Sequence, residues 1–176
     1  MIEVTVESIR VSLINQQRLV VLRETGSPRF LPIWIGPFEA EAITLGLQGA
    51  EVPRPMTHDL LKSLLDHLGA TVSYVYISDL KEETYFARIV LDARGEQIEV
   101  DSRTSDAIAL AVRVAASIYV NETVMEQAGQ LPAIGEEAGG EEPAGGARAP
   151  AETSDDGLSV FREFFENLDV SDADPD

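Results

Sequence analysis

Acidic and basic side chains gather at one predicted junction between a strand and a helix. Asp101, Arg103 and Asp106 lie within six residues of one another, in the segment D-S-R-T-S-D. Carboxylates can hold a metal ion or take up a proton, and the planar guanidinium group of arginine can bind a phosphate. Because ligand sites often lie where the end of a strand meets a helix, this junction is the first candidate site.

The residue pattern around the junction predicts how these side chains are held. Residues 98–101 alternate between apolar and acidic types, which is typical of a strand with two different faces. From Thr104 or Ser105, either of which could cap a helix, apolar residues recur at the spacing of one helix face to about position 117. Asp106 falls in the first turn, where a negative charge suits the exposed amide groups.

An earlier segment has the same design. A strand that ends at Ile35 is followed by Gly36-Pro37 and a helical pattern, and proline is well suited to a first helical turn. At an offset of 65 residues (106 − 41 = 65), Glu41 falls on Asp106. The apolar residues of the two helices match at the same offset. These matches predict a duplicated β-β-β-α unit.

Periodicity and turn residues divide the first 128 residues into strands and helices. A slip in the alternation near Ser8 predicts a β-bulge, and Thr57 is expected to cap a helix with one leucine stripe that ends at Gly69. The predicted fold class is α+β, a mostly antiparallel sheet with packed helices and a disordered acidic tail. The predicted strands are 2–13, 19–22, 30–35, 71–77, 85–91 and 97–101, the predicted helices 37–49, 57–68 and 104–117, with a turn at 79–83 and further helical turns in 118–128.

Composition and charge narrow the class of protein. The chain has no cysteine, which excludes disulfides, thiolate zinc sites and cysteine nucleophiles. Residues 1–128 carry 18 acidic and 11 basic side chains, a net charge of −7, and residues 129–176 carry 13 and 2, a net charge of −11. Neither part has the basic stripe typical of nucleic-acid binding. With no signal peptide and no apolar run near ~20 residues, we expect a cytoplasmic protein without membrane contact.

The composition changes beyond the predicted domain. We expect a domain over residues 1–128 and a disordered linker rich in glycine, alanine, glutamate and proline over 129–156. Phenylalanines and leucines at helical spacing predict a short amphipathic helix over 157–170, before a disordered end at 171–176. Such a helix could dock on its own domain, on an oligomer partner or on another protein.

Three segments carry a resemblance to a known family. They are G-P-F-E-A-E-A-I at 36–43, R-P-M-T-H-D-L at 54–60 and D-S-R-T-S-D-A-I-A-L-A at 101–111. In this order they resemble the bifunctional nuclease domain family, bacterial and plant proteins that cut both DNA and RNA. The resemblance spans about residues 1–128 and departs at Thr104, where the family usually has proline. The segment F-R-E-F-F at 161–165 resembles the tail of actinobacterial members.

The resemblance implies a nuclease whose substrates are DNA and RNA. Phosphodiester hydrolysis needs an attacking water and stabilisation of charge on the phosphoryl oxygens, which Mg²⁺ or Mn²⁺ held by carboxylates commonly supplies. In the matched segments the candidate catalytic residues are Glu39, His58 and Asp106, and the candidate phosphate-binding residues are Arg54 and Arg103. The candidate metal ligands are Glu39, Glu41, Asp59, Asp101 and Asp106.

Several of these residues also have a structural interpretation. Asp59 and Asp106 lie in first helical turns, where an acid favours the helix dipole. Arg103 could form a local ion pair that fixes the junction. Glu39 shares a predicted helix face with apolar residues, and a partly buried acid needs either a partner or a metal.

Two hypotheses on function therefore remain open. The first is a nuclease assisted by a divalent metal. The second is a non-catalytic binding or regulatory module with a docking C-terminal helix, which the acidic charge favours because a polyanion is repelled. In either case the edge strands of an open antiparallel sheet favour a homo-oligomer.

Overall fold

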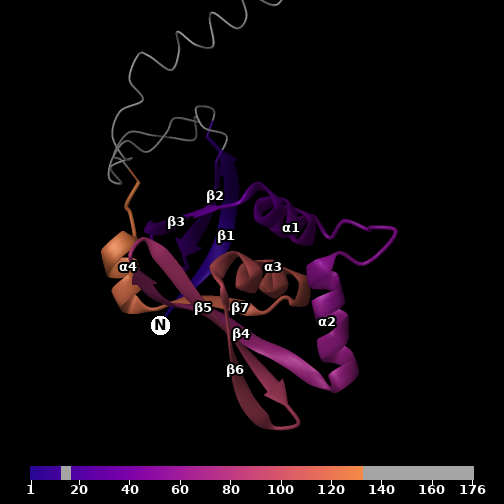
Figure 1. Cartoon of the computed structure of the whole chain (residues 1–176). Helices are drawn as coiled ribbons and strands as arrows, with labels where there is room; N and C mark the ends of the chain where they lie inside the picture. The colour runs from indigo at the N-terminus through magenta and orange to yellow at the C-terminus, as the bar shows by residue number, and fades with distance from the viewer. Residues whose placement is uncertain (13–16, 133–176) are drawn as a thin grey trace, which may run out of the picture. The chain divides into compact units, whose positions relative to one another are not determined.

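A computed structural model describes residues 1–12 and 17–132 of the chain, in the order of elements shown in Figure 1. The strands are β1 (Ile2–Val11), β2 (Arg18–Glu24), β3 (Phe30–Ile35), β4 (Ala70–Lys81), β5 (Thr84–Ala93), β6 (Glu96–Arg103) and β7 (Ser117–Val120). The helices are α1 (Pro37–Gln48), α2 (Thr57–Leu68), α3 (Thr104–Val114) and α4 (Glu122–Ala128). The predicted linker beyond residue 132, the predicted helix 157–170 and the end 171–176 lie outside the described residues.

The strands of this part of the chain form one sheet in the order β3-β2-β1-β7-β4-β5-β6. β7 runs parallel to β4 and antiparallel to β1, and the other neighbouring pairs are antiparallel. β1 and β4 therefore run in opposite directions on the two sides of β7. The predicted α+β class and the mostly antiparallel sheet are confirmed.

The connectivity repeats on the two sides of β7. The meander β1-β2-β3 leads into α1, and the meander β4-β5-β6 leads into α3, which is the order that two β-β-β-α units require. α2 separates the two units along the chain. The predicted bulge near Ser8 is present, since the β1–β2 register shifts between Val6 and Ser8. The duplication itself stays a prediction.

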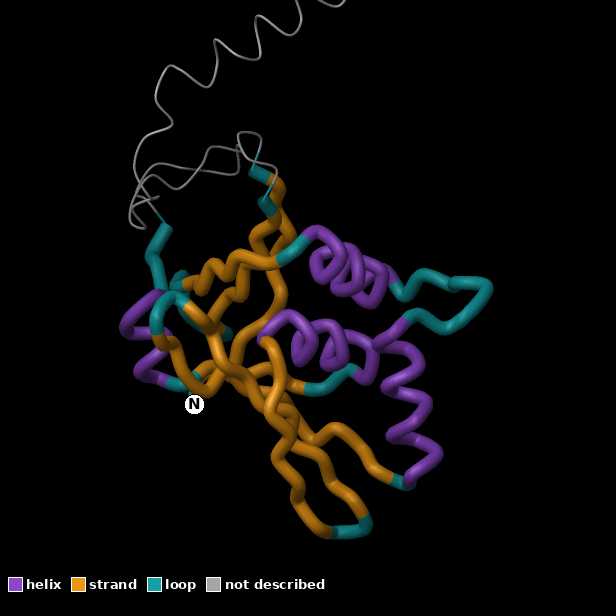
Figure 2. The backbone as a smooth tube through the Cα atoms, viewed as in Figure 1, coloured by secondary structure: helices purple, strands orange, loops and turns teal. Residues whose placement is uncertain are grey.

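The core lies between the sheet and α3. Alternate residues of the central strands, such as Val75 and Ile77 of β4, are buried in one cluster with α3. Residues 107–111 of α3 are all buried, because α1 and α2 pack against this helix, as Figure 2 shows. α4 packs instead against β3 and β4. α3 is thus the most enclosed helix of the described part, and its first turn carries the predicted junction.

Of residues 118–128, expected to add a further helical turn or two, only the second half is helical. Ser117–Val120 forms β7, the strand that joins the two meanders, and only Glu122–Ala128 is helical. Ile118 and Val120 are buried while Tyr119 is not. Four residues show too little alternation to reveal a strand, and its place between β1 and β4 is set by pairing partners far away in the chain.

The predicted helix caps are also corrected. The N-cap of α3 is Arg103, and the N-cap of α2 is Met56, so Thr57 and Thr104 are the first helical residues. Thr104 is 4% exposed, and its Oγ1 has no hydrogen-bond partner among the described residues. At α2 the N-cap residue Met56 offers no capping side chain. Instead, Oδ2 of Asp59 in the first turn accepts a hydrogen bond from the Met56 amide at 2.9 Å.

The hairpin between β4 and β5 is longer than predicted. Residues 79–81 continue β4, and the turn consists of Glu82 and Glu83, both with positive φ. Register shifts after Val72 and after Ile77 interrupt the alternation of β4, which is why the sequence pattern ends too early. At the other end of the domain, Gln130 exchanges backbone hydrogen bonds with Phe30, so the fold continues two residues beyond the predicted boundary.

α2 has the predicted bounds but an unexpected setting. It ends at Gly69, which adopts the left-handed conformation. None of its residues is buried, and of the leucine stripe only Leu65 packs against the core. No helix within residues 1–12 and 17–132 is both long and apolar enough to cross a membrane.

Candidate functional site

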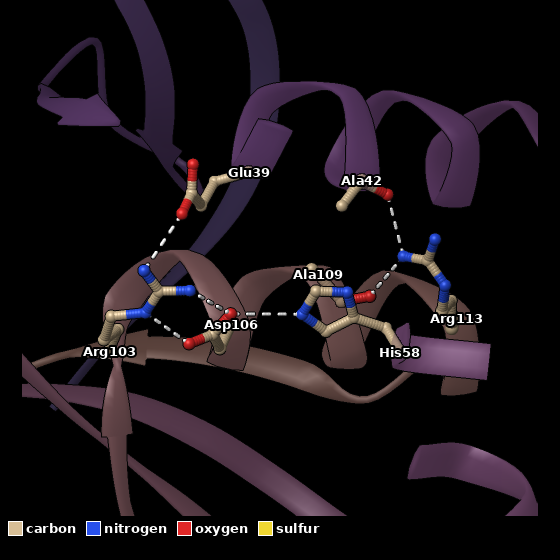
Figure 3. Close-up of polar contacts among 7 residues, drawn as sticks. All are labelled: Glu39, Ala42, His58, Arg103, Asp106, Ala109 and Arg113. Atoms are coloured by element: carbon tan, nitrogen blue, oxygen red, sulfur yellow. Dashed lines mark hydrogen bonds and ion pairs between the residues drawn. The ribbon is translucent and has the colours of Figure 1, made fainter. Parts of the chain in front are cut away.

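Arg103 ends β6 and forms the centre of a polar cluster. Its Nε and Nη2 donate hydrogen bonds to Oδ2 and Oδ1 of Asp106 at 2.6 and 3.0 Å, and its Nη1 donates to Oε1 of Glu39 at 2.9 Å (Figure 3). Since a guanidinium group has five N–H donors, one remains on each terminal nitrogen. The side chain of Arg103 is 66% exposed, so the group is accessible from solvent.

Glu39 reaches this cluster from the first turn of α1. The helix begins at Pro37 after the N-cap residue Gly36. A Cβ atom at Gly36 would overlap the Oε2 atom of Glu39, so the glycine leaves room for the carboxylate to fold back over the helix start. The side chain of Glu39 is 22% exposed, which agrees with the prediction of a partly buried acid that needs a partner.

His58 completes the cluster from α2. Its Nε2 lies 3.2 Å from Oδ1 of Asp106, the same oxygen to which Nη2 of Arg103 donates. The side chains of His58 and Asp106 are 12% and 30% exposed. Helices α1, α2 and α3 thus each contribute to one connected group, formed by Glu39, Arg103, Asp106 and His58 (Figure 3) and called here the Arg103 cluster.

The electrostatics of the site favour the charged forms of Asp106 and Arg103. Burial by itself raises the pKa of Asp106, but hydrogen bonds from Arg103 and His58 outweigh burial and hold that pKa below its usual value. Hydrogen bonding and charge attraction from Asp106 raise the pKa of Arg103 above its ordinary value, and Glu39 adds to the effect. Asp106 is therefore a carboxylate that accepts hydrogen bonds near neutral pH.

A second arginine ties the same three helices together at the other end of α3. Arg113 donates from Nε to Oδ1 of Asp59 at 2.6 Å, and from Nη1 to the carbonyl oxygens of Ala42 and Ala109, each at 2.8 Å. Its side chain is only 6% exposed. The hydrogen bond from Arg113 is the main cause that lowers the pKa of Asp59, with burial acting in the opposite direction.

The sequence reasoning did not identify Arg113. Its one signal is position, because Arg113 follows Ala109 by four residues and so lies on the buried face of the helix. A cation at such a place needs a partner from another element. The partner is Asp59, predicted as a metal ligand or as a structural acid of the first helical turn. Its carboxylate accepts hydrogen bonds from Arg113 and from the Met56 amide, and both contacts are structural.

The structure unites some of the predicted site residues and separates others. The structure brings together four of them: Glu39, His58, Arg103 and Asp106. Asp59 instead binds Arg113. The side chains of Glu41 and Asp101 are exposed and make no hydrogen bond or ion pair with any residue of the described ranges. The same holds for Arg54 in the loop between α1 and α2. The offset of the predicted repeat aligned Glu41 with Asp106, but it is Glu39 that reaches Asp106's partner Arg103.

The described residues do not offer the set of ligands that a divalent cation needs. No group of three or more histidine, aspartate or glutamate side chains that could hold a metal ion occurs in residues 1–12 and 17–132. In the Arg103 cluster, both Asp106 oxygens and one Glu39 oxygen already accept hydrogen bonds from arginine. This arrangement does not fit a resident metal ion, which needs several oxygen ligands free to face it.

Comparisons with known proteins agree with the resemblance. A family model described as the bifunctional nuclease domain matches residues 20–132. An uncharacterized protein of Mycobacterium tuberculosis is 41% identical over 170 residues, which cover 97% of this chain and 96% of that protein. Bifunctional nuclease 2 of Oryza sativa subsp. japonica is 32% identical over 112 residues, 61% of this chain and 34% of the plant protein. Bifunctional nuclease 2 of Arabidopsis thaliana is 29% identical over 107 residues, 59% and 32% of the two chains.

Proposed function

The chain belongs to the bifunctional nuclease domain family, and on that premise we propose that it hydrolyses phosphodiester bonds of DNA and RNA. The plant relatives named as nucleases share about a third of their own length with it. The observation that carries the proposal is the Arg103 guanidinium group, which is exposed, held by two carboxylates and linked through Asp106 to His58.

In this proposal Arg103 binds the phosphate of the substrate. Glu39 and Asp106 fix the plane of the guanidinium group, and the two N–H groups that they leave could donate to phosphoryl oxygens. A group positioned in advance stabilises charge in the transition state without reorganisation. Because one arginine supplies the contact and the domain is acidic, we expect weak binding with a shallow salt dependence.

His58 is proposed as the base, with Asp106 as the residue that positions it. The bond of Nε2 to the Asp106 carboxylate puts the hydrogen on that nitrogen and leaves Nδ1 as the proton acceptor. The oxygen of a water would attack phosphorus while the bond to the leaving oxygen breaks. His58 would take one proton from the water, and solvent would supply a proton to the leaving oxygen.

The sequence led us to expect Mg²⁺ or Mn²⁺, but the proposed mechanism does not require either ion, and the assay below varies the metal. The Arg103 cluster does not fit a resident cation, so none of the steps above depends on one. A divalent ion bound together with the substrate phosphate would add positive charge that the acidic domain lacks.

The test is a degradation assay with the full-length chain on plasmid DNA and on RNA. Each substrate is incubated with a chelator, with Mg²⁺ or with Mn²⁺. We expect the wild type to degrade both substrates and the Arg103→Ala and His58→Gln variants to lose about 10²–10³-fold in rate. The control is Arg10→Ala, which removes an exposed arginine of β1 outside the Arg103 cluster.

Two results would contradict the proposal. Equal activity in wild type, Arg103→Ala and His58→Gln would indicate a contaminating nuclease. No degradation of either substrate under any of the metal conditions would favour the second candidate, a non-catalytic binding or regulatory module. That candidate is favoured by the exposed leucines of α2 and by the net charge of −18, which suit a protein partner better than a polyanion.

A further inference from the structure

One face of α2 is apolar and open to solvent. The side chains of Leu60, Leu61, Leu64 and Leu68 are 53%, 36%, 51% and 68% exposed, and together they are called here the α2 leucine face. Met56, at the start of the helix, is 46% exposed. In water such a continuous apolar face is unfavourable, and on natural proteins it usually marks an interaction surface.

The contacts of α2 with its own domain lie on other sides of the helix. His58 bonds to Asp106 and Asp59 to Arg113, while Leu65 provides the apolar contact with the core. The α2 leucine face is therefore not needed to attach the helix. Leu61, Leu64 and Leu68 follow the 3-4 spacing with which helices pack side by side.

Charge is absent from the middle of this face. Lys62 and Asp66 are two positions away from Leu64 in either direction, about 200° around the helix, so they point away from it. The chain as a whole carries a net charge of −18. Two copies repel each other over most of their surface, and a face without acids is where they can approach most closely.

We propose that the α2 leucine face is the interface between two copies of this chain, with the two α2 helices packed antiparallel around a twofold axis at Leu64. In a twofold interface the same patch must complement itself. Around this axis Leu64 meets Leu64, and Leu60 of each copy meets Leu68 of the other (60 + 68 = 2 × 64). Leucine thus meets leucine at positions 60, 64 and 68.

The main competing route to a dimer is pairing of the edge strand β6 with itself. In the antiparallel register that pairs Ile98 with Val100, Glu99 faces Glu99 of the other copy. In the register that pairs Val100 with itself, Glu99 faces Asp101. Like charges directly across two strands are destabilising, and charged residues commonly protect exposed strand edges from such pairing. The charges thus favour α2 over β6 as the interface.

The first experiment measures the mass of the full-length chain in solution by light scattering at micromolar concentration. We expect a dimer for the wild type and a monomer for Leu64→Glu, with unchanged circular dichroism because Leu64 lies outside the core. The control is Phe38→Glu, which places the same charge on the 80% exposed side chain of α1 and should leave the dimer intact.

The second experiment tests the register and uses the absence of cysteine from the chain. Leu64→Cys should oxidise to a disulfide-linked dimer. Leu60→Cys alone should not, because two copies of residue 60 would lie about 12 Å apart along the helix axes, beyond the reach of a disulfide. A mixture of Leu60→Cys and Leu68→Cys should link.

A monomeric wild type would overturn the proposal, and so would a dimer that persists in Leu64→Glu or dissociates in Phe38→Glu. The proposal would also be overturned if the chain is a monomer and the thiol of Leu64→Cys does not react with a maleimide, because something other than a second copy would then cover the α2 leucine face. A dimer that links through Leu60→Cys alone would contradict the antiparallel register.

Discussion

Two arginines at opposite ends of α3 bind the same set of helices in different ways. Arg103 is 66% exposed and its partners are the carboxylates of Glu39 and Asp106. Arg113 is 6% exposed and binds Asp59 and two backbone carbonyl oxygens. Both link α3 with α1, and both connect with α2, Arg103 through Asp106 and His58.

The difference lies in what each arginine can still do. Arg113 binds a carbonyl oxygen that is fixed to α1 and a carboxylate that comes from α2, so its bonds hold both helices against α3 and keep His58 beside Asp106. Side-chain carboxylates orient Arg103 but leave it in contact with solvent. Burial and partner type, rather than residue type, therefore separate the structural arginine from the candidate functional one.

The largest loss of stability is expected from Arg113→Ala. It leaves Asp59 unpaired and two carbonyl oxygens without their donor, so the free energy of unfolding should fall by about 3–5 kcal/mol. Chemical denaturation followed by circular dichroism measures the loss. Arg113→Lys keeps the charge but not the planar set of donors, so its free energy of unfolding should lie between those of the wild type and Arg113→Ala. A loss below about 1 kcal/mol would remove the contrast between the two arginines.

Arg103→Ala should show the opposite balance. We expect a change of at most about 1 kcal/mol in the free energy of unfolding, because the ion pairs are exposed. The rate of nucleic-acid degradation should fall by about 10²–10³-fold in the same preparation. Arg103→Lys should retain stability without restoring the rate, since lysine lacks the planar set of donors. A variant that loses stability and activity in parallel would make Arg103 structural.

Gly46 of α1 and Gly36, the N-cap residue of the same helix, allow a matched comparison. A Cβ at Gly46 would lie 2.6 Å from Cγ2 of Val112 and 2.8 Å from Nη1 of Arg113, so Gly46→Ala should destabilise the fold by about 1–3 kcal/mol. The three atoms nearest to a Cβ at Gly36 all belong to the flexible carboxylate of Glu39. Gly36→Ala should therefore lower activity by displacing Glu39 while the denaturation midpoint stays nearly unchanged. The reverse pattern would contradict the assignment of the two regions.

The smallest effect on stability is expected when the pH is lowered. The pKa values of Asp59 and Asp106 lie below their usual values, so the unfolded chain binds protons more readily than the folded one. The stability from both groups is complete above the unfolded pKa of about 4 and is lost as pH falls through the folded pKa values. Denaturation midpoints between about pH 6 and pH 3 should fall less steeply in Asp59→Asn and Asp106→Asn. Unchanged slopes in both variants would contradict this linkage.

Local patterns predicted a large share of the fold. The strand at 30–35, the α1 and α2 helices and the bulge near Ser8 follow from periodicity, proline at the first helical turn and glycine at the last. β7 was missed because four residues carry too little periodicity. The segments that resemble the family placed Glu39, His58, Arg103 and Asp106 among the candidates, but they placed Glu41, Asp59 and Asp101 there as well.

The sequence by itself determined the α+β class, the positions of most elements and the family. Those features depend on residue types at fixed short spacings, which the chain displays directly. Only the tertiary structure decided which acids meet which arginines, because Glu39 and Arg103 are 64 residues apart and His58 and Asp106 are 48 apart. It also decided that the leucines of α2 face outwards, since an amphipathic pattern does not state what will cover its apolar side.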